Sequence, residues 1–209
     1  RNVRLRVAYD GARFFGWQRQ DGFTSVQESL EDALLAATGE RAVVHGAGRT
    51  DTGVHALGQV AHVHVATRLD DDRLRHALNA LTPAGVTIDR LETCRADFHA
   101  RFDARSKRYA YVVATGRFEP PFAPGRCHWV KWPLDMERMR AAARELVGRH
   151  DFRAFGNTGS PRPSTVRTLQ HLRVVTRRRG FGFVVQADGF LYNMVRNIAG
   201  TLIEPAEAS

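Results

Sequence analysis

The stretch HGAGRTDTGVHALGQ, residues 45–59, places a single carboxylate in a loop of small residues. Asp51 stands between Gly48 and Gly53, so a ligand can approach its side chain with little obstruction. An ionised aspartate in such a place can act as a nucleophile towards a sugar carbon or as a general base. Arg49 can keep that carboxylate ionised or contact a phosphate.

Other interpretations of this region compete with catalysis. Asp51 can instead cap a turn, with Thr50 and Thr52 as local hydrogen-bonding partners. A dinucleotide fingerprint is rejected, because Asp51 stands where the third glycine belongs and a strand follows instead of a helix. His62 and His64 alternate on one strand with no carboxylate or thiol nearby, so we interpret them as a polar strand face. We predict no metal site.

The chain is strongly basic. Its 209 residues include 31 Lys and Arg against 22 Asp and Glu, a formal net charge of +9 at pH 7. Such a surface favours polyanions, because contacts to phosphates release bound counterions. Nearly all the basic residues are arginines, which suit phosphate contacts and stacking on bases, although a compositional bias explains that ratio equally well.

The composition also bears on the compartment. No apolar run approaches the roughly 20 residues that a membrane span needs, so we expect no membrane partner and a cytoplasmic protein. Cys94 and Cys127 do not form a metal-binding or redox pair, and we expect both to be reduced thiols.

Hydrophobic periodicity predicts the elements that must position the loop. In the first half we expect strands over residues 3–10, 41–47, 58–67 and 86–94, and helices over residues 25–39 and 70–85. This β-α-β-β-α-β order is typical of a ferredoxin-like unit, and it defines a first domain over residues 1–96.

The second domain, residues 97–209, repeats this order more loosely. We expect a strand over residues 106–116, a helix over 134–150, a hairpin over 166–189 and a helix over 190–204. The hairpin contains RRGFGFVV, which is close to the RNA-recognition strand whose aromatic residues stack on bases. We favour a structural interpretation in which Gly180 makes the turn and Phe181 and Phe183 face a core.

Five blocks of sequence, in order, resemble the tRNA pseudouridine synthase A family along nearly the whole chain. They are YDGARFFGWQRQ from Tyr9, GAGRTDTGVHALGQVAH from Gly46, FHARFDARSKRYAY from Phe98, HDFRAF from His150 and FLYNMVRNIAG from Phe190. The resemblance implies an α+β pseudouridine synthase fold, with two ferredoxin-like or RRM-like halves, a mostly antiparallel sheet and a central active-site cleft. It also implies a homodimer that holds tRNA.

The resemblance further implies a reaction. Enzymes of this family break the bond between N1 and C1′ of uridine, turn the base and rejoin it through C5, at uridines 38, 39 and 40 of the anticodon stem-loop. No redox step or outside group is needed, so no cofactor is implied. The target base must first leave its stack.

By this resemblance four residues have roles at the catalytic centre. Asp51 is the carboxylate that attacks C1′ or C6 or acts as a base, and Arg49 assists base flipping. Tyr109 packs on the flipped uracil, and Arg196 pairs with the aspartate; on spacing alone Tyr109 is a core aromatic. Weaker RNA-contact candidates are basic or polar residues: Arg101, Arg105, Lys107, Arg108 and His55, with Arg162 and Arg167 beside an irregular loop.

The chain departs from the family pattern in two places. Thr52 stands where family members more often have alanine, and the chain ends GTLIEPAEAS where they continue with a turn, a helix and a strand. From this ending we expect a second half that is incomplete at its end, and the absence of an initiator methionine before Arg1 also indicates a fragment.

Two rival functions stay open. A non-catalytic RNA-binding module predicts that Asp51→Ala changes nothing. A glycosidase would use Asp51 as nucleophile and water to finish the reaction, and would release free base.

Overall fold

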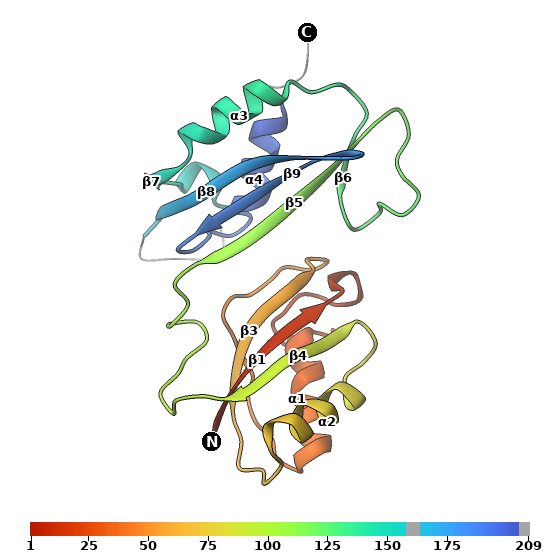
Figure 1. The fold of residues 1–209 in the computed structure, drawn as a ribbon, viewed down its shortest axis with the longest axis vertical. Coiled ribbons are helices and arrows are strands. Elements are labelled where there is room, and N and C mark those ends of the chain that lie inside the picture. The colour runs from red at the N-terminus through yellow and green to blue at the C-terminus, as the bar shows by residue number, and fades with distance from the viewer. Residues whose placement is uncertain (158–163, 205–209) are drawn as a thin grey trace. The chain divides into compact units, whose positions relative to one another are not determined.

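The computed structural model describes residues 1–157 and 164–204, which belong to two compact units, Arg1–Ala104 and Arg105–Ser209 (Figure 1). The expectations for Arg162 and for the chain end after Glu204 lie outside the described residues. The division expected at residue 96 falls in the segment between the last strand of the first unit and the first strand of the second.

The first unit is a four-stranded antiparallel sheet with two helices on one face (Figure 1). Its elements are β1 (Asn2–Tyr9), α1 (Val26–Thr38), β2 (His45–Gly46), β3 (Ala56–His64), α2 (Asp71–Leu81) and β4 (Val86–Thr93). The sheet order β2-β3-β1-β4, with this chain order, is the ferredoxin-like arrangement and confirms the prediction for this half. The strand expected over residues 41–47 is shorter, because only His45–Gly46 pairs with β3.

Local signals in the sequence set the ends of α1. The Ser25 side chain accepts a hydrogen bond from the Glu28 N–H at 3.2 Å, as an N-cap does. Gly39 ends the helix in the left-handed conformation, with φ +74°. The apolar face of α1, including Leu30 and Leu34, packs on the buried side chains of β1.

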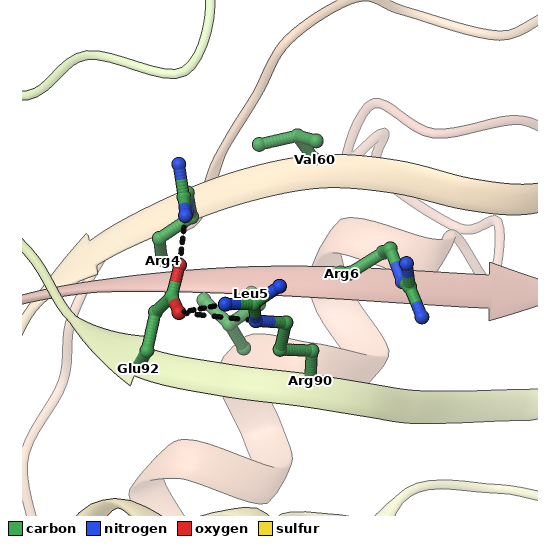
Figure 2. A pocket seen from close by; sticks show the side chains of 6 residues that line it. All are labelled: Arg4, Leu5, Arg6, Val60, Arg90 and Glu92. Atoms are coloured by element: carbon green, nitrogen blue, oxygen red, sulfur yellow. Dashed lines mark hydrogen bonds and ion pairs between the residues drawn. The ribbon is translucent and has the colours of Figure 1, made fainter.

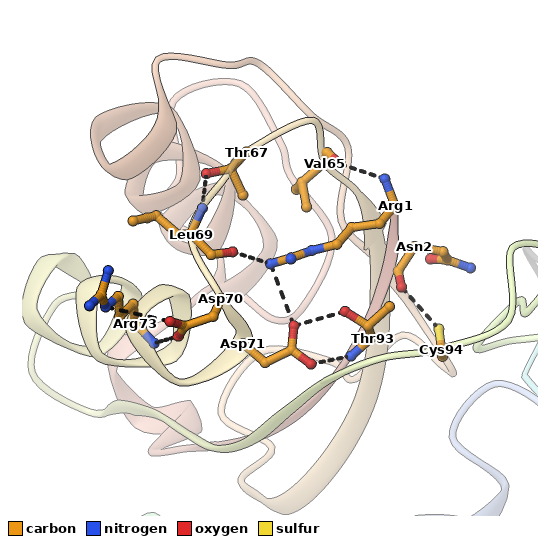
Figure 3. A network of polar contacts seen from close by, with 10 residues as sticks. All are labelled: Arg1, Asn2, Val65, Thr67, Leu69, Asp70, Asp71, Arg73, Thr93 and Cys94. Atoms are coloured by element: carbon orange, nitrogen blue, oxygen red, sulfur yellow. Dashed lines mark hydrogen bonds and ion pairs between the residues drawn. The ribbon is translucent and has the colours of Figure 1, made fainter.

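At the other helix, a carboxylate ties α2 to the sheet (Figure 3). Asp71, in the first turn of α2, accepts hydrogen bonds from the backbone N–H and the hydroxyl of Thr93, at 2.6 and 2.8 Å. Asp70 caps the helix by accepting from the N–H of Arg73 at 2.8 Å. Asp71, at the N-terminal end of this helix, where the helix dipole is positive, therefore also anchors the helix to β4. Cys94, just after β4, is a free thiol, as is Cys127.

The second unit has a five-stranded mixed sheet in the order β6-β5-β9-β8-β7. Its elements are β5 (Lys107–Thr115), β6 (His128–Val130), α3 (Met136–Glu145), β7 (Gly148–Asp151), a short helical turn η2 (Arg153–Phe155), β8 (Val166–Arg177), β9 (Gly180–Ala187) and α4 (Met194–Ile203). Helices α3 and α4 both contribute to its core. The helix expected over residues 134–150 is wrong at its end: α3 ends at Glu145, Gly148 has φ +118°, and Gly148–Asp151 pairs with β8.

The hairpin of β8 and β9 confirms the structural interpretation of RRGFGFVV. Phe181 and Phe183 are each 1% exposed and lie in the core of the second unit, so they cannot stack on a base. A Cβ at Gly180 would lie 2.0 Å from the carbonyl oxygen of Val113, which leaves room for glycine alone.

No helix among the described residues is long and apolar enough to cross a membrane.

Candidate active site

Asp51 lies in the loop of residues 47–55 that connects β2 to β3, hereafter the Asp51 loop. The Asp51 and Arg49 side chains are exposed, and the Val54 N–H donates to the Asp51 carbonyl at 3.1 Å to close a turn. Gly53 has φ +78° within that turn. No ion pair joins Arg49 to Asp51 in the part of the chain that the structure describes.

Tyr9, at the end of β1, and the segment after it hold the Asp51 loop in place at Thr50, the residue before Asp51. The Tyr9 hydroxyl and the Thr50 Oγ1 are 2.8 Å apart, and the Trp17 N–H donates to the Thr50 carbonyl at 3.0 Å. Trp17 is 2% exposed, and a Cβ at Gly46 would lie 2.6 Å from its indole ring. Two sequence blocks far apart in the chain therefore form one local structure around Thr50.

Two glycines of the first block are required by the backbone of the Asp51 loop. A Cβ at Gly11 would lie 2.1 Å from the Val54 carbonyl oxygen, and one at Gly16 would lie 2.6 Å from that of Thr50. Gly16 also has φ +87°, a conformation that side chains disfavour. The residues on both sides of Asp51 are thus packed against glycine backbone, which holds the carboxylate at a defined place.

Side chains secure the two ends of the Asp51 loop. The Gln59 Nε2 donates to the Gly48 carbonyl at 2.6 Å. The His55 Nδ1 lies 3.0 Å from the Asp10 Oδ1, so this candidate RNA contact also anchors the loop to the first block. A role of His55 towards RNA stays a prediction.

Two residues of helix α1, Gln27 and Glu31, hold the segments that flank the Asp51 loop. Neither residue was identified from the sequence. Gln27, 7% exposed, accepts from the Arg19 N–H at 3.1 Å and donates to Glu31 at 3.0 Å, while its own N–H donates to the Trp17 carbonyl at 3.0 Å. Glu31 accepts from the Val44 N–H at 3.1 Å. One helical turn therefore holds both the Trp17 segment and the chain that enters the Asp51 loop. The only sequence signal was their i, i+4 spacing on α1.

The interpretation of His62 as part of a polar strand face is wrong. His62 is 2% exposed, because the turn after Phe98 covers it and the Ala100 N–H donates to its Nδ1 at 3.1 Å. The rings of His45 and His99 lie 5.1 and 4.5 Å from it. Among the described residues, no group of three or more His, Cys, Asp or Glu side chains could hold a metal ion.

Acid should destabilise the fold through His62. Burial, followed by the charges of His99, His45 and His64, lowers the pKa of His62 from 6.5 to about 4. The unfolded chain therefore binds a proton below about pH 6.5 that the folded chain binds only near pH 4, so stability falls as the pH drops through this window, by up to about 3 kcal/mol. Urea unfolding at pH 7 and about pH 4.5 measures this change.

His62→Asn isolates this effect, because asparagine can still accept from the Ala100 N–H but does not titrate. We expect the variant to lose less stability than the parent chain between the two pH values. His76→Asn, at an exposed position of α2, should keep the parent slope. Equal slopes for the parent chain and His62→Asn would contradict the assignment.

Tyr109 and Arg196 lie in the second unit. Tyr109 is half-buried on β5, and its ring meets that of Phe190 edge-on at 5.1 Å. Burial raises the pKa of Tyr111 on β5, and the positive charge of Arg196, exposed on α4, opposes part of that rise. Asp51 and Arg49 belong to the first unit, so the pairing of Arg196 with Asp51 stays a prediction.

The basic candidates differ in their surroundings. Arg101 and Arg105 are exposed, whereas Arg108 donates to the Gln186 Oε1 at 2.7 and 3.1 Å. Lys107 is half-buried at the start of β5. Arg167 donates to two backbone carbonyls, of Ser164 at 3.0 Å and Val166 at 2.6 Å. These contacts leave Arg101 and Arg105 as the more available pair.

A hollow on the strands of the first sheet does not contain Asp51 (Figure 2). It is lined by Arg4, Leu5, Arg6, Val60, Arg90 and Glu92. Arg4 and Arg90 both pair with Glu92, and the hydrogen bond from Arg4 is the largest cause of the lowered pKa of that carboxyl. Arg6 pairs with Asp89 at 2.7 Å. Because its cations are already paired, we do not take this hollow as the functional site.

Comparison with known proteins gives consistent matches. A family model described as tRNA pseudouridine synthase matches residues 6–103 and 142–208. The chain is 42% identical over 202 residues to a tRNA pseudouridine synthase A of Thermoanaerobacter sp. strain X514, covering 97% of this chain and 83% of that protein. It is 41% identical over 204 residues to the protein of that name from Acetivibrio thermocellus, covering 98% and 84%.

Proposed function

The chain belongs to the tRNA pseudouridine synthase family, and we propose that it isomerises uridine to pseudouridine in the anticodon stem-loop of tRNA by means of Asp51. Family membership makes it an isomerase that acts on tRNA. The proposed targets are uridines 38, 39 and 40. The observation that carries the role of Asp51 is its exposed carboxylate on a loop whose backbone is held on both sides, at Thr50 and Val54.

The reaction needs a carboxylate at a defined place. Asp51 attacks C1′ or C6, or removes a proton from the ribose, and the bond between N1 and C1′ breaks. When C5 later bonds to C1′, the bond from Asp51 to C1′ or C6 breaks, or the ribose regains its proton, so the carboxylate is regenerated. The base turns and forms a bond from C5 to C1′, C5 gives up its proton, and N1 gains one, so substrate and product have the same composition. The contacts of Thr50 with Tyr9 and Trp17 give the Asp51 carboxylate a rigid support. A carboxylate held in this way reaches the reacting atom at little cost in entropy.

The other site residues complete this proposal. Arg49, exposed beside Asp51, fills the space that the flipped base leaves. Tyr109 packs on the uracil, and its contact with Phe190 holds the ring in place. Arg196 keeps Asp51 ionised through its positive charge. We further propose a cytoplasmic homodimer.

The test is release of tritium from C5-labelled uridine in unmodified tRNA, with nucleoside analysis of the product. We expect tritium release matched by pseudouridine in the RNA, with no free uracil. Free uracil would identify a glycosidase. Binding of tRNA with neither product would leave a non-catalytic RNA-binding module.

Gln27 should position the Asp51 loop for catalysis. In Gln27→Ala the Arg19 N–H loses its acceptor and Glu31 loses one donor. The Trp17 segment then keeps the Gln27 backbone N–H and the ion pair of Arg19 with Glu31. Because the side-chain contacts of Gln27 are gone, the Asp51 loop can shift. We expect turnover to fall about 10- to 100-fold with little change in the KM for tRNA, and stability to fall by about 1–3 kcal/mol. Steady-state tritium release and urea unfolding measure the two effects.

Asp71→Asn is the matched control for Gln27→Ala. It weakens an anchor of similar kind between α2 and Thr93 (Figure 3). Thr93 pairs near the start of β1, whereas Tyr9, at the other end of that strand, contacts the Asp51 loop. We expect it to lower stability and leave turnover unchanged. Equal turnover losses in both variants would show that Gln27 acts through stability alone.

A further inference from the structure

We propose that Phe102 is a stacking platform for an unpaired base of the tRNA substrate. The side chain is 77% exposed, on a turn that backbone hydrogen bonds hold. This inference rests on the proposed function, because it takes RNA to be the substrate. It adds a binding role for an aromatic residue beside Arg101.

Phe102 is the outer member of a column of rings. Its ring centroid lies 4.3 Å from that of His99, which lies 4.5 Å from that of His62. His62 in turn stacks on His45 at 5.1 Å. The column therefore runs from a buried residue of β3 to an exposed aromatic face.

The turn that carries Phe102 is held by hydrogen bonds. The N–H groups of Phe102 and Asp103 donate to the His99 carbonyl at 3.1 and 2.9 Å, and the His99 N–H donates to the Asp103 carboxylate at 2.8 Å. The Asn2 Nδ2, at the start of β1, donates to the Phe98 carbonyl at 2.8 Å. With the backbone of the turn fixed and the ring in contact with His99, the Phe102 side chain loses less conformational freedom when a ligand stacks on it.

The chemistry around the ring favours a nucleic acid. The Arg101 guanidinium carbon lies 5.8 Å from the centre of the Phe102 ring, and Arg101 forms no ion pair within residues 1–157 and 164–204. An aromatic face beside an available cation suits a base and its phosphate. Because every base has a π face, such a platform serves the unpaired nucleotides of an anticodon loop regardless of sequence.

The platform and the catalytic carboxylate belong to the same unit. The exposed His45, whose ring lies beside those of His62 and His99 at 5.1 and 5.7 Å, is in β2, and the Asp51 loop begins directly after that strand. A base stacked on Phe102 would therefore fix the RNA with respect to Asp51. We infer that Phe102 contributes to RNA binding and not to the chemical step.

Phe118 offers a matched control in the second unit. It is also 77% exposed, and the Arg117 guanidinium carbon lies 5.4 Å from its ring centre. No ring stacks beneath Phe118 in the described part of the chain. Phe118→Ala therefore removes an equivalent exposed ring without a column.

The experiment measures binding of unmodified tRNA in the Asp51→Asn background, which separates binding from turnover. We expect Phe102→Ala to raise Kd roughly tenfold, Phe102→Trp to stay within about twofold, and Phe118→Ala to have no effect. With Asp51 restored, Phe102→Ala should keep its turnover at saturating tRNA. Because binding is read without chemistry, absence of tritium release would overturn the proposed function and leave this inference standing.

Three outcomes would overturn the inference. The first is an unchanged Kd for Phe102→Ala. The second is an equal loss for Phe118→Ala, which would reveal a general effect of exposed rings. The third is a smaller particle by light scattering for Phe102→Ala, which would make the ring a contact with a second copy of the chain.

Discussion

Asp51→Asn should lower tritium release from C5-labelled uridine in tRNA by at least about a thousandfold, with tRNA affinity unchanged. The substitution keeps the shape of the side chain and removes the charge that the reaction needs, whether Asp51 acts as nucleophile or base. Its side chain is exposed, so the fold should be unaffected. Single-turnover assays with saturating enzyme measure the chemical step directly.

Asp21→Asn is the control, because it also removes one negative charge from the first unit. Asp21 is exposed, and we expect the variant to retain full activity. If Asp51→Asn kept the parent rate, the carboxylate would have no part in the chemistry, and the turn-capping interpretation of Asp51 would be preferred.

The second large effect is expected for Gly16→Ala. The new methyl group would meet the Thr50 carbonyl at 2.6 Å, and the backbone at φ +87° would be strained. Either Trp17 or the Asp51 loop must move, so we expect activity to fall about 100-fold or more. We also expect stability to fall by several kcal/mol, because strain and steric overlap add. Tritium release and thermal unfolding measure the two losses.

Gly22→Ala separates strain from steric overlap. Gly22 has a similar φ of +79°, but nothing lies within 4 Å of a Cβ built there. We expect this variant to lose about 1–2 kcal/mol of stability and to retain activity. Equal activity in Gly16→Ala and Gly22→Ala would mean that the contact with Thr50 does not position Asp51.

Most regular elements could be predicted because their signals are local. The alternation of β1, the Ser25 cap and the Gly39 end of α1 depend on residues a few positions apart. The prediction of secondary structure was weaker where pairing with another strand decides whether a segment is helix or strand. The sequence predicts a helix that continues through residue 150, yet Gly148–Asp151 forms β7 because β8 offers its edge and Gly148 breaks the helix.

The candidate site likewise has one part that the local sequence predicts and another that depends on contacts between distant segments. Asp51, Arg49 and the small residues around them are consecutive, so the sequence alone indicated a carboxylate open to a ligand. Gln27 is connected to Val44 through Glu31, which accepts hydrogen bonds from both. Gly16 packs directly against the Thr50 carbonyl. Both roles therefore depend on contacts with segments that are distant in the sequence. Periodicity reports only the face on which a residue lies, not which distant segment meets it.

The sequence by itself determined the family, the ferredoxin-like order of the first unit and the residue that carries the proposed chemistry. The tertiary structure alone decided that Gly11 and Gly16 leave room for the Asp51 loop and that His62 is buried beneath the turn of Ala100. It also decided that Phe102 ends a column of rings. The physical reason is that these features are contacts between segments far apart in the chain, which form only when β1, β3 and the turn after β4 come together in the fold.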